Sequence, residues 1–241
     1  MTSWLPLGEL RPDARVCLLC LPHAGGRAHA YASWRQSAPA DVDVCPVELP
    51  GHGTRYAERA LSSIPALASA AAVALRPRAG QDLVLFGHSM GALVAFETAR
   101  ELRDLHGVDV RHLFVAAERA PQLSARAVLH ALPGPVFRQK VSELGGTPPE
   151  VLANDELFAA VEPLLRTDLA ACETYAYVGG AQLSCPITVY AGSVDKTLRR
   201  EELEAWREQT TGPFELHVLP GDHFFPRTAE AQLLGSVLAS V

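Results

Sequence analysis

The sequence lacks the features that would assign it to a membrane or nucleic-acid-binding class. Its 241 residues contain no apolar run near the roughly 18 residues that a membrane-spanning helix needs. Basic residues are in the minority, and a net charge of −6 argues against general binding to nucleic acid or to anionic membranes. The first ten residues, MTSWLPLGEL, carry neither the basic nor the apolar segment of a signal peptide. We therefore expect a cytoplasmic protein with no membrane and no nucleic-acid partner.

Cysteines are few and odd in number, and metal-binding motifs are missing. Five cysteines in a chain of this length do not form a disulfide scaffold, and they indicate a reducing compartment. Cys17 and Cys20 could suggest a redox or metal pair, but a separation of three within a strand places their side chains on opposite faces of a sheet. The sequence contains no HExxH motif. We therefore expect no metal and no cofactor of the protein's own.

What the sequence does contain is an alternation of strand and helix patterns. Apolar runs that predict buried strands lie at 16–21, 42–49, 83–86, 112–117, 187–191 and 214–219. Helical patterns lie at 30–37, 64–75, 90–105, 201–209 and 229–238. This alternation predicts an α/β fold, with a mostly parallel central sheet flanked by helices, and we expect one domain over residues 1–241.

One stretch interrupts the alternation. Residues 121–180 contain only helix and turn patterns, between the strands expected at 112–117 and 187–191. An insertion at this point would lie over the carboxyl edge of the sheet, where open α/β folds place the cover of an active site. We therefore expect a helical lid over about 121–180.

A nucleophile elbow is the most informative motif. GHSMG at 87–91 matches the pattern G-x-S-x-G, with an apolar strand before it and a helix after it. The serine of such an elbow occupies a strained turn with its hydroxyl exposed, and the glycines leave room where strand and helix crowd together. A chance match in a tight turn is the alternative, and the flanking strand and helix disfavour it. Ser89 is therefore the candidate nucleophile.

A serine hydroxyl needs a base, and the base needs an orienting carboxylate. In this fold the chain order is serine, acid, histidine. His223 follows the last expected strand and is the candidate base. The alternative is that His223 is a histidine of a surface loop without a catalytic role. Asp195, just after the strand at 187–191, is the candidate acid. Asp222 is a rival because it neighbours His223, and Asp168 in the lid is a weaker third choice.

The oxyanion of the reaction needs two backbone N–H donors. The residue after the nucleophile, Met90, supplies one, and the loop after the first strand supplies the other. That loop reads LPHAGG at 21–26, and its glycines let the backbone bend close to the site. We expect the second donor to be the Ala24 amide.

Six segments spread over nearly the whole chain form a specific set. They are LPHAGG (21–26), ELPGHGTR (48–55), FGHSMGALVAFETAR (86–100), LGGTPPEVLAN (144–154), CPITVYAG (185–192) and GDHFF (221–225). With them the chain resembles the type II thioesterases of polyketide and nonribosomal peptide assembly lines, within the α/β-hydrolase superfamily. The lid segment at 144–154 is the most specific, because general hydrolases of this fold share the elbow and would not be expected to share LGGTPPE.

The resemblance implies a site, a substrate and a partner. The family's triad falls on Ser89, Asp195 and His223, and its oxyanion amides fall on Ala24 and Met90. The implied substrate is an acyl group in thioester linkage to the phosphopantetheine arm of an acyl or peptidyl carrier protein. The implied role is editing, in which stalled or misprimed acyl units are hydrolysed so that the carrier can work again.

The chain departs from the family's pattern at three places without losing a catalytic group. A Ser-Gly pair is usual in the strand before the first lid segment, where this chain has Ala116-Ala117-Glu118-Arg119-Ala120-Pro121. Lys196 follows the acid where proline is common, and Asp222 precedes the histidine where glycine is common. Glu118 and Asp222 therefore add negative charge near the expected site.

The lid is expected to supply the acyl pocket and the surface that meets the carrier. Candidate pocket residues are Leu132, Val136, Phe137, Leu157, Phe158 and Leu165. Their spacing fits equally well a helix face packed in the core. Carrier proteins are usually acidic, so candidate docking residues are Arg126, Arg138 and Lys140, with simple solvation as the alternative. We expect a monomer.

Two other function classes stay open at this point. The chain could be another serine hydrolase, such as a carboxylesterase or a chain-releasing cyclase. It could also be a noncatalytic binding module on a hydrolase fold, although such a module need not keep all three triad groups.

Overall fold

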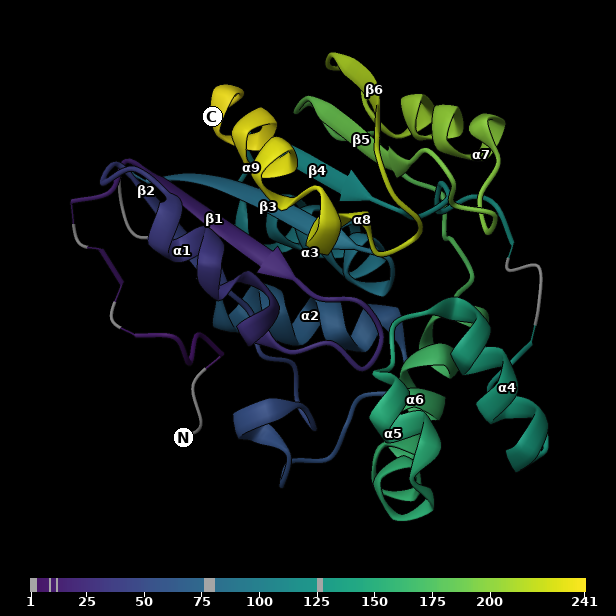
Figure 1. Ribbon diagram of the computed structural model, residues 1–241. Coiled ribbons are helices and arrows are strands. Elements are labelled where there is room, and N and C mark those ends of the chain that lie inside the picture. The colour runs from purple at the N-terminus through teal and green to yellow at the C-terminus, as the bar shows by residue number, and fades with distance from the viewer. Residues whose placement is uncertain (1–3, 9, 12, 76–80, 125–127) are drawn as a thin grey trace.

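A parallel β-sheet forms the centre of the computed structural model, which describes residues 4–8, 10–11, 13–75, 81–124 and 128–241 (Figure 1). Within these ranges six strands form one sheet in the order β2-β1-β3-β4-β5-β6, and every neighbouring pair is parallel. The strands are β1 (Val16–Leu21), β2 (Val42–Pro46), β3 (Asp82–His88), β4 (His112–Ala116), β5 (Ile187–Gly192) and β6 (Phe214–Leu219). The expected α/β fold with a parallel sheet is confirmed.

Helices cover both faces of this sheet. They are α1 (Ala32–Ser37), α2 (Ile64–Ala74), α3 (Met90–His106), α7 (Arg200–Glu204), α8 (Phe225–Thr228) and α9 (Glu230–Ala239), with 3₁₀ turns at Ala28–Tyr31, Gly53–Arg55 and Ala205–Gln209. One core contains apolar residues of α2, α3 and α7, and the other contains those of α1, α8 and α9. Figure 1 shows α1 and α9 lying over one face of the sheet. The two cores explain why the strands read as continuous apolar runs.

Side chains alternate between the two faces of the sheet along β1, and this alternation separates Cys17 from Cys20. Cys17 belongs to the core beneath α2 and α3, whereas Cys20 belongs to the core beneath α1 and α9. Both are buried free thiols. The prediction that they lie on opposite faces is therefore confirmed.

Among the described residues between β4 and β5, three helices lie within the stretch expected to be a lid. They are α4 (Gly134–Leu144), α5 (Pro149–Ala153) and α6 (Asp155–Glu173). Asn154 caps α6, because its side chain accepts a hydrogen bond from the Leu157 amide at 3.0 Å. Figure 1 shows these helices beyond the sheet, on the side toward which the β1 and β4 arrows point. We call residues 121–180 the insertion.

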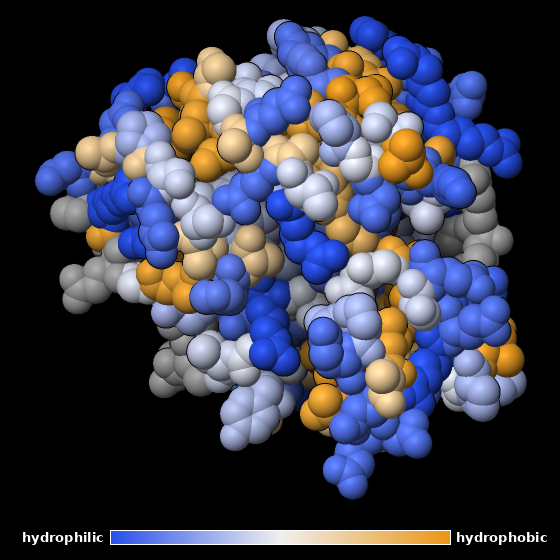
Figure 2. Space-filling view, viewed as in Figure 1, coloured by the Kyte–Doolittle hydropathy of each residue, from blue (hydrophilic) through white to orange (hydrophobic). Residues whose placement is uncertain are grey.

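The insertion has its own small core. Phe137 and Val141 of α4 pack with Phe158 of α6, and all three side chains are buried. Apolar residues also reach its surface between polar ones, as Figure 2 shows over the region of α5 and α6. The insertion is therefore a thin layer of helices with a core much smaller than the two cores of the sheet.

A few boundaries differ from the sequence prediction. β2 ends at Pro46 instead of residue 49, because the chain then leaves the sheet and the Glu48 amide donates to the Trp4 carbonyl. The helix expected over 201–209 divides into α7 and a 3₁₀ turn, and α8 had no clear signal in the sequence. Across the described residues, no helix combines the length and the apolar character needed to cross a membrane.

Candidate active site

Ser89 lies at the sharp turn between β3 and α3. Its backbone has φ 52° and ψ −122°, a strained conformation for a residue with a side chain. A Cβ on Gly87 would lie 2.2 Å from the Gly91 carbonyl oxygen, and one on Gly91 would lie 2.2 Å from the Leu21 carbonyl oxygen. Neither position can hold a side chain without moving the backbone. The strained turn at Ser89 therefore requires glycine on both sides of it.

Asp195 and His223 meet at the same edge of the sheet. Asp195 follows β5 and His223 follows β6, and His223 Nδ1 donates to Asp195 Oδ2 at 3.0 Å. Thr197 also holds the carboxylate, because its amide and hydroxyl donate to Asp195 Oδ1 at 2.8 and 2.7 Å. Burial alone would raise the pKa of Asp195, but the hydrogen bond and charge of His223 and the bonds from Thr197 lower it. The carboxylate is therefore ionised and orients the imidazole.

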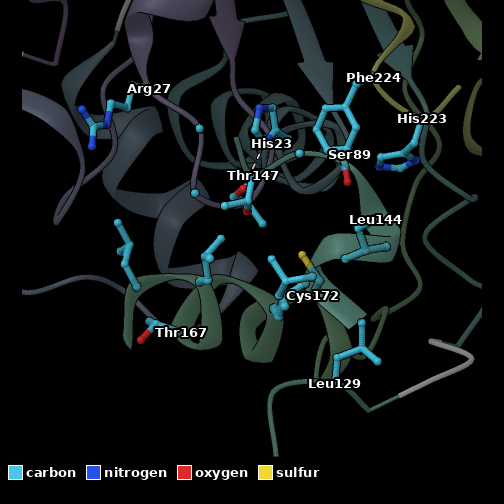
Figure 3. Close-up of a pocket in the computed structure, with 18 of the residues that line it drawn as sticks. His23, Arg27, Ser89, Leu129, Leu144, Thr147, Thr167, Cys172, His223 and Phe224 are labelled. Atoms are coloured by element: carbon cyan, nitrogen blue, oxygen red, sulfur yellow. Dashed lines mark hydrogen bonds between the residues drawn. The ribbon is translucent and has the colours of Figure 1, made fainter. Parts of the chain in front are cut away.

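Ser89 and His223 face the same pocket, and Figure 3 shows the serine hydroxyl beside the imidazole ring. Because Nδ1 is bound to Asp195, Nε2 is the ring nitrogen left for the serine. The structure thus brings the three predicted triad residues to one place.

Neither rival acid lies in that arrangement. The Asp222 carboxylate accepts a hydrogen bond from the Phe224 amide at 2.8 Å, which is a local turn contact. Asp168 bonds to the Gly25 amide and to His52 instead. Among the described carboxylates, Asp195 is the one that bonds to the His223 ring.

The two expected oxyanion amides lie at the same site. Met90 is the first residue of α3, so its N–H has no partner in the preceding turn. Ala24 lies in the loop after β1, where the Gly26 amide donates to the His23 carbonyl at 2.8 Å and tightens the turn. Within the part of the chain that the structure describes, neither the Ala24 nor the Met90 amide donates a hydrogen bond. Both remain free for a substrate oxygen.

His88 is a residue of the site that sequence reasoning missed. It lies before the serine and so fails the chain order for a base, yet its Nε2 donates to the His223 carbonyl at 2.8 Å. Burial, followed by the neighbouring His23 and His223, holds its pKa well below the ordinary value, so the ring is neutral. Its edge meets the rings of His23 and Phe224. His88 therefore braces the loop that carries the candidate base.

A pocket of about 1320 Å³ opens beside Ser89. Its walls come from the loops after β1, β2, β4, β5 and β6 and from the insertion. Glu118 lines it, and burial raises the pKa of that carboxyl group. Across the described residues, no cluster of His, Cys, Asp and Glu has the form of a metal site. Glu58 and Glu173 also line the pocket, so its partly apolar wall carries acidic groups as well.

The predicted pocket residues need correction, because only Leu165 of the six lines this cavity. Phe137 and Phe158 form the insertion's own core, and Leu132 packs against it. Val136 and Leu157 are 42% and 48% exposed. A short helical layer buries part of its apolar surface between its own helices, and side chains at the border of that core, such as Val141, also reach the pocket. The apolar insertion side chains in the wall that sequence reasoning missed include Leu129, Val141, Leu144, Val151, Val161, Leu164 and Leu169.

The predicted basic residues of the insertion are engaged locally. Arg138 pairs with Asp155 at 2.6 Å, and Lys140 pairs with Glu143 at 2.6 Å. Arg126 lies outside the described residues. Arg27 and Arg227 instead line the pocket, and both are exposed.

Comparison with known proteins agrees with this geometry. The thioesterase domain family matches residues 17–240. The thioesterase PikA5 of Streptomyces venezuelae is 39% identical over 92% of this chain and 79% of its own length. The solved structure of RedJ, a thioesterase from the prodiginine pathway of Streptomyces coelicolor, is 38% identical, with a TM-score of 0.89 and coverage of 96% of this chain and 87% of that one. YbtT, a type II thioesterase from the yersiniabactin NRPS/PKS pathway, is 31% identical, with a TM-score of 0.83 and coverage of 97% and 96%. The chain therefore belongs to the thioesterase family and is a serine hydrolase with the α/β-hydrolase fold.

Proposed function

We propose that this enzyme hydrolyses acyl thioesters on the phosphopantetheine arm of acyl or peptidyl carrier proteins, and so clears stalled or misprimed units in polyketide or nonribosomal peptide synthesis. One observation carries the proposal. The Asp195–His223 pair lies beside a serine in a strained elbow, and Ser89 and His223 line a large pocket whose walls are partly apolar. The relatives described above as thioesterases of such pathways support the substrate class.

In the proposed mechanism, Ser89 attacks the thioester carbonyl while His223 Nε2 accepts the hydroxyl proton. The amides of Ala24 and Met90 stabilise the oxyanion. The C–S bond then breaks, and the proton on His223 passes to the leaving pantetheine thiolate. An acyl ester on Ser89 results. Water, deprotonated by His223, attacks this ester and releases the free acid and the serine.

The carrier protein is expected to meet the mouth of the pocket rather than the face of α4. Arg27 and Arg227 lie at that mouth, and their charge suits the phosphate of the pantetheine arm and an acidic carrier. Arg138 and Lys140 suit this role less, because each is already paired with a carboxylate. We infer a monomeric, cytoplasmic enzyme with no cofactor of its own.

The test measures steady-state rates on carrier protein loaded with acyl groups from acetyl to long chain, beside matched oxygen esters. We expect kcat/KM to be higher for the carrier thioesters, with free acid as the product. A preference for oxygen esters would identify a carboxylesterase, and a cyclic product would identify a chain-releasing cyclase. Ser89→Ala, which should be folded and inactive, is the control for contaminating hydrolases.

A further inference from the structure

Asp168 belongs to α6 of the insertion, yet its carboxylate is buried against loops of the sheet. Its side chain is 1% exposed. Oδ2 accepts one hydrogen bond from the Gly25 amide at 2.6 Å and another from His52 Nε2 at 2.8 Å. Gly25 lies in the loop after β1, and His52 lies in the turn after β2. One carboxylate therefore joins three segments that are distant in the sequence.

Both hydrogen-bond partners of His52 are oxygen acceptors, which favours an ion pair at this contact. Its Nδ1 faces the Pro50 carbonyl oxygen at 3.1 Å, and its Nε2 faces the Asp168 carboxylate. Both ring nitrogens therefore donate, as in an imidazolium. Burial by itself would lower the pKa of His52, but the hydrogen bond and charge of Asp168 outweigh it and raise the pKa. The structure keeps a cation and an anion together in a site with almost no solvent.

Helix α6 presses closely on Gly25. The glycine has φ +72°, and a Cβ there would lie 2.6 Å from Cδ2 of Leu165, one turn before Asp168. The amide of Gly25 and the carbonyl of Ala24 belong to one planar peptide unit. Asp168 holds the N–H of that unit, and His23 Nδ1 donates to its carbonyl oxygen at 2.9 Å. The unit is thus fixed at both ends.

We propose that Asp168 is a positioning residue for the oxyanion loop. It acts through the Gly25 amide, which fixes the orientation of Ala24 and so aims the Ala24 N–H at the reacting oxygen. The ion pair with His52 holds the carboxylate in place for this task. The inference rests on the proposed function, because it assigns to Ala24 a part in that reaction. A consequence is that the oxyanion loop is complete only while α6 is docked on the sheet.

The test compares Asp168→Asn with the wild type and with Glu162→Gln. Glu162 lies on the same helix and pairs with Arg166 of that helix at 2.6 Å, so its substitution perturbs α6 at a place away from the loop after β1. A misplaced catalytic donor costs up to about 100-fold in rate. Asparagine removes the charge that pairs with His52 and brings an NH2 group into a buried place where Asp168 Oδ1 has no hydrogen-bond partner among the described residues, so the acceptor of the Gly25 amide is no longer held in place. We expect Asp168→Asn to lower kcat between about tenfold and 100-fold at little change in KM, and Glu162→Gln to stay within about twofold of the wild type.

The rate at which a fluorophosphonate labels Ser89 provides a second readout. This reaction needs the oxyanion site but not a carrier thioester, so it separates a failure of this inference from a failure of the proposed function. Labelling of Asp168→Asn should slow by a factor similar to the loss in kcat. Unchanged labelling, a change in KM alone, or an equal loss in Glu162→Gln would overturn the positioning role. If Asp168→Asn does not fold, His52→Gln takes its place, and labelling at the wild-type rate in that variant would equally overturn it.

Discussion

The central sheet with its loops and the insertion differ in how completely their residues are buried. Every residue of β1, β2 and β4 is buried, as is all but one residue of β3 and of β5, the strands that lead to Ser89 and Asp195. The edge strand β6, which leads to His223, buries only Leu219. In the insertion, α5 buries no residue, and the 19-residue α6 buries only Phe158, Asp168 and Ala171. The chemistry thus rests on the densely packed part of the molecule, and the acyl pocket rests partly on the thinly packed part.

The difference matches what each part has to do. Catalytic atoms must be held within narrow limits of distance and angle, which densely packed strands and short loops provide. A wall that contacts a variable acyl chain needs apolar surface more than fixed geometry. Asp168 joins the two parts, since it carries a buried contact from the insertion to the loop after β1.

The largest expected difference between the sheet and the insertion appears in kcat when one hydroxyl is removed from each. Ser89→Ala should lower kcat by about 10⁵-fold or more, because no other group replaces the nucleophile. Ser142→Ala, at an exposed position of α4, should leave kcat unchanged. Rates on acyl-carrier thioester and circular dichroism of both variants check this. Activity of folded Ser89→Ala near that of the wild type would remove Ser89 from the mechanism.

The next largest effect tests which carboxylate orients the base. Asp195→Asn should lower kcat by about 10⁴-fold, because an amide can hold His223 in the wrong tautomer. Asp222→Asn is the matched control, since an asparagine oxygen can still accept from the Phe224 amide, and its kcat should stay close to that of the wild type. Single-turnover rates of both variants decide the point, and the opposite pattern would reassign the acid to Asp222.

Residues in the sheet part were predictable because local sequence and tertiary role coincide there. The elbow needs glycine at 87 and 91 for steric reasons, and an apolar run such as 16–21 can be recognised as a strand without knowledge of its neighbours. Chain order then selects Asp195 and His223. Thr197 and His88 were not predicted. His88 acts through a hydrogen bond to a residue distant in the sequence, and the contact of Thr197 with Asp195 belongs to no recognisable motif.

Residues in the insertion were not predictable in the same way. Helical periodicity shows that Phe137 and Phe158 share an apolar face with their neighbours, but it does not say whether that face meets a cavity or another helix. Here it meets another helix. Leu165 was placed correctly, and its close approach to Gly25 depends on two segments 140 positions apart in numbering, which no local pattern encodes.

A smaller effect is expected on stability, and it compares a buried with a half-exposed residue of α6. Phe158→Ala should lower the free energy of unfolding of the insertion by about 3 kcal/mol, because it empties the centre of a small core. Leu157→Ser, at the half-exposed neighbouring position, should change it by less than about 0.5 kcal/mol. Hydrogen exchange of α4 and α6 measures both. Equal protection in the two variants would show that the insertion draws its stability from the sheet instead.

The smallest effect concerns the link between the two parts, and it depends on pH. The pKa of His52 is raised in the folded protein, because Asp168 in α6 and, more weakly, Glu48 after β2 outweigh the effect of burial. The ion pair therefore stabilises the fold fully below the ordinary histidine pKa of about 6.5, and this stabilisation is lost as the pH rises through the higher folded value. The difference in free energy of unfolding between the wild type and Asp168→Asn should accordingly be larger at pH 6 than at pH 9, as urea titrations can measure. His52→Gln cannot titrate at this position, so the same difference taken between His52→Gln and the double variant should not change with pH. A pH-dependent difference in that background would assign the titration to another group and leave the buried carboxylate paired with a neutral imidazole.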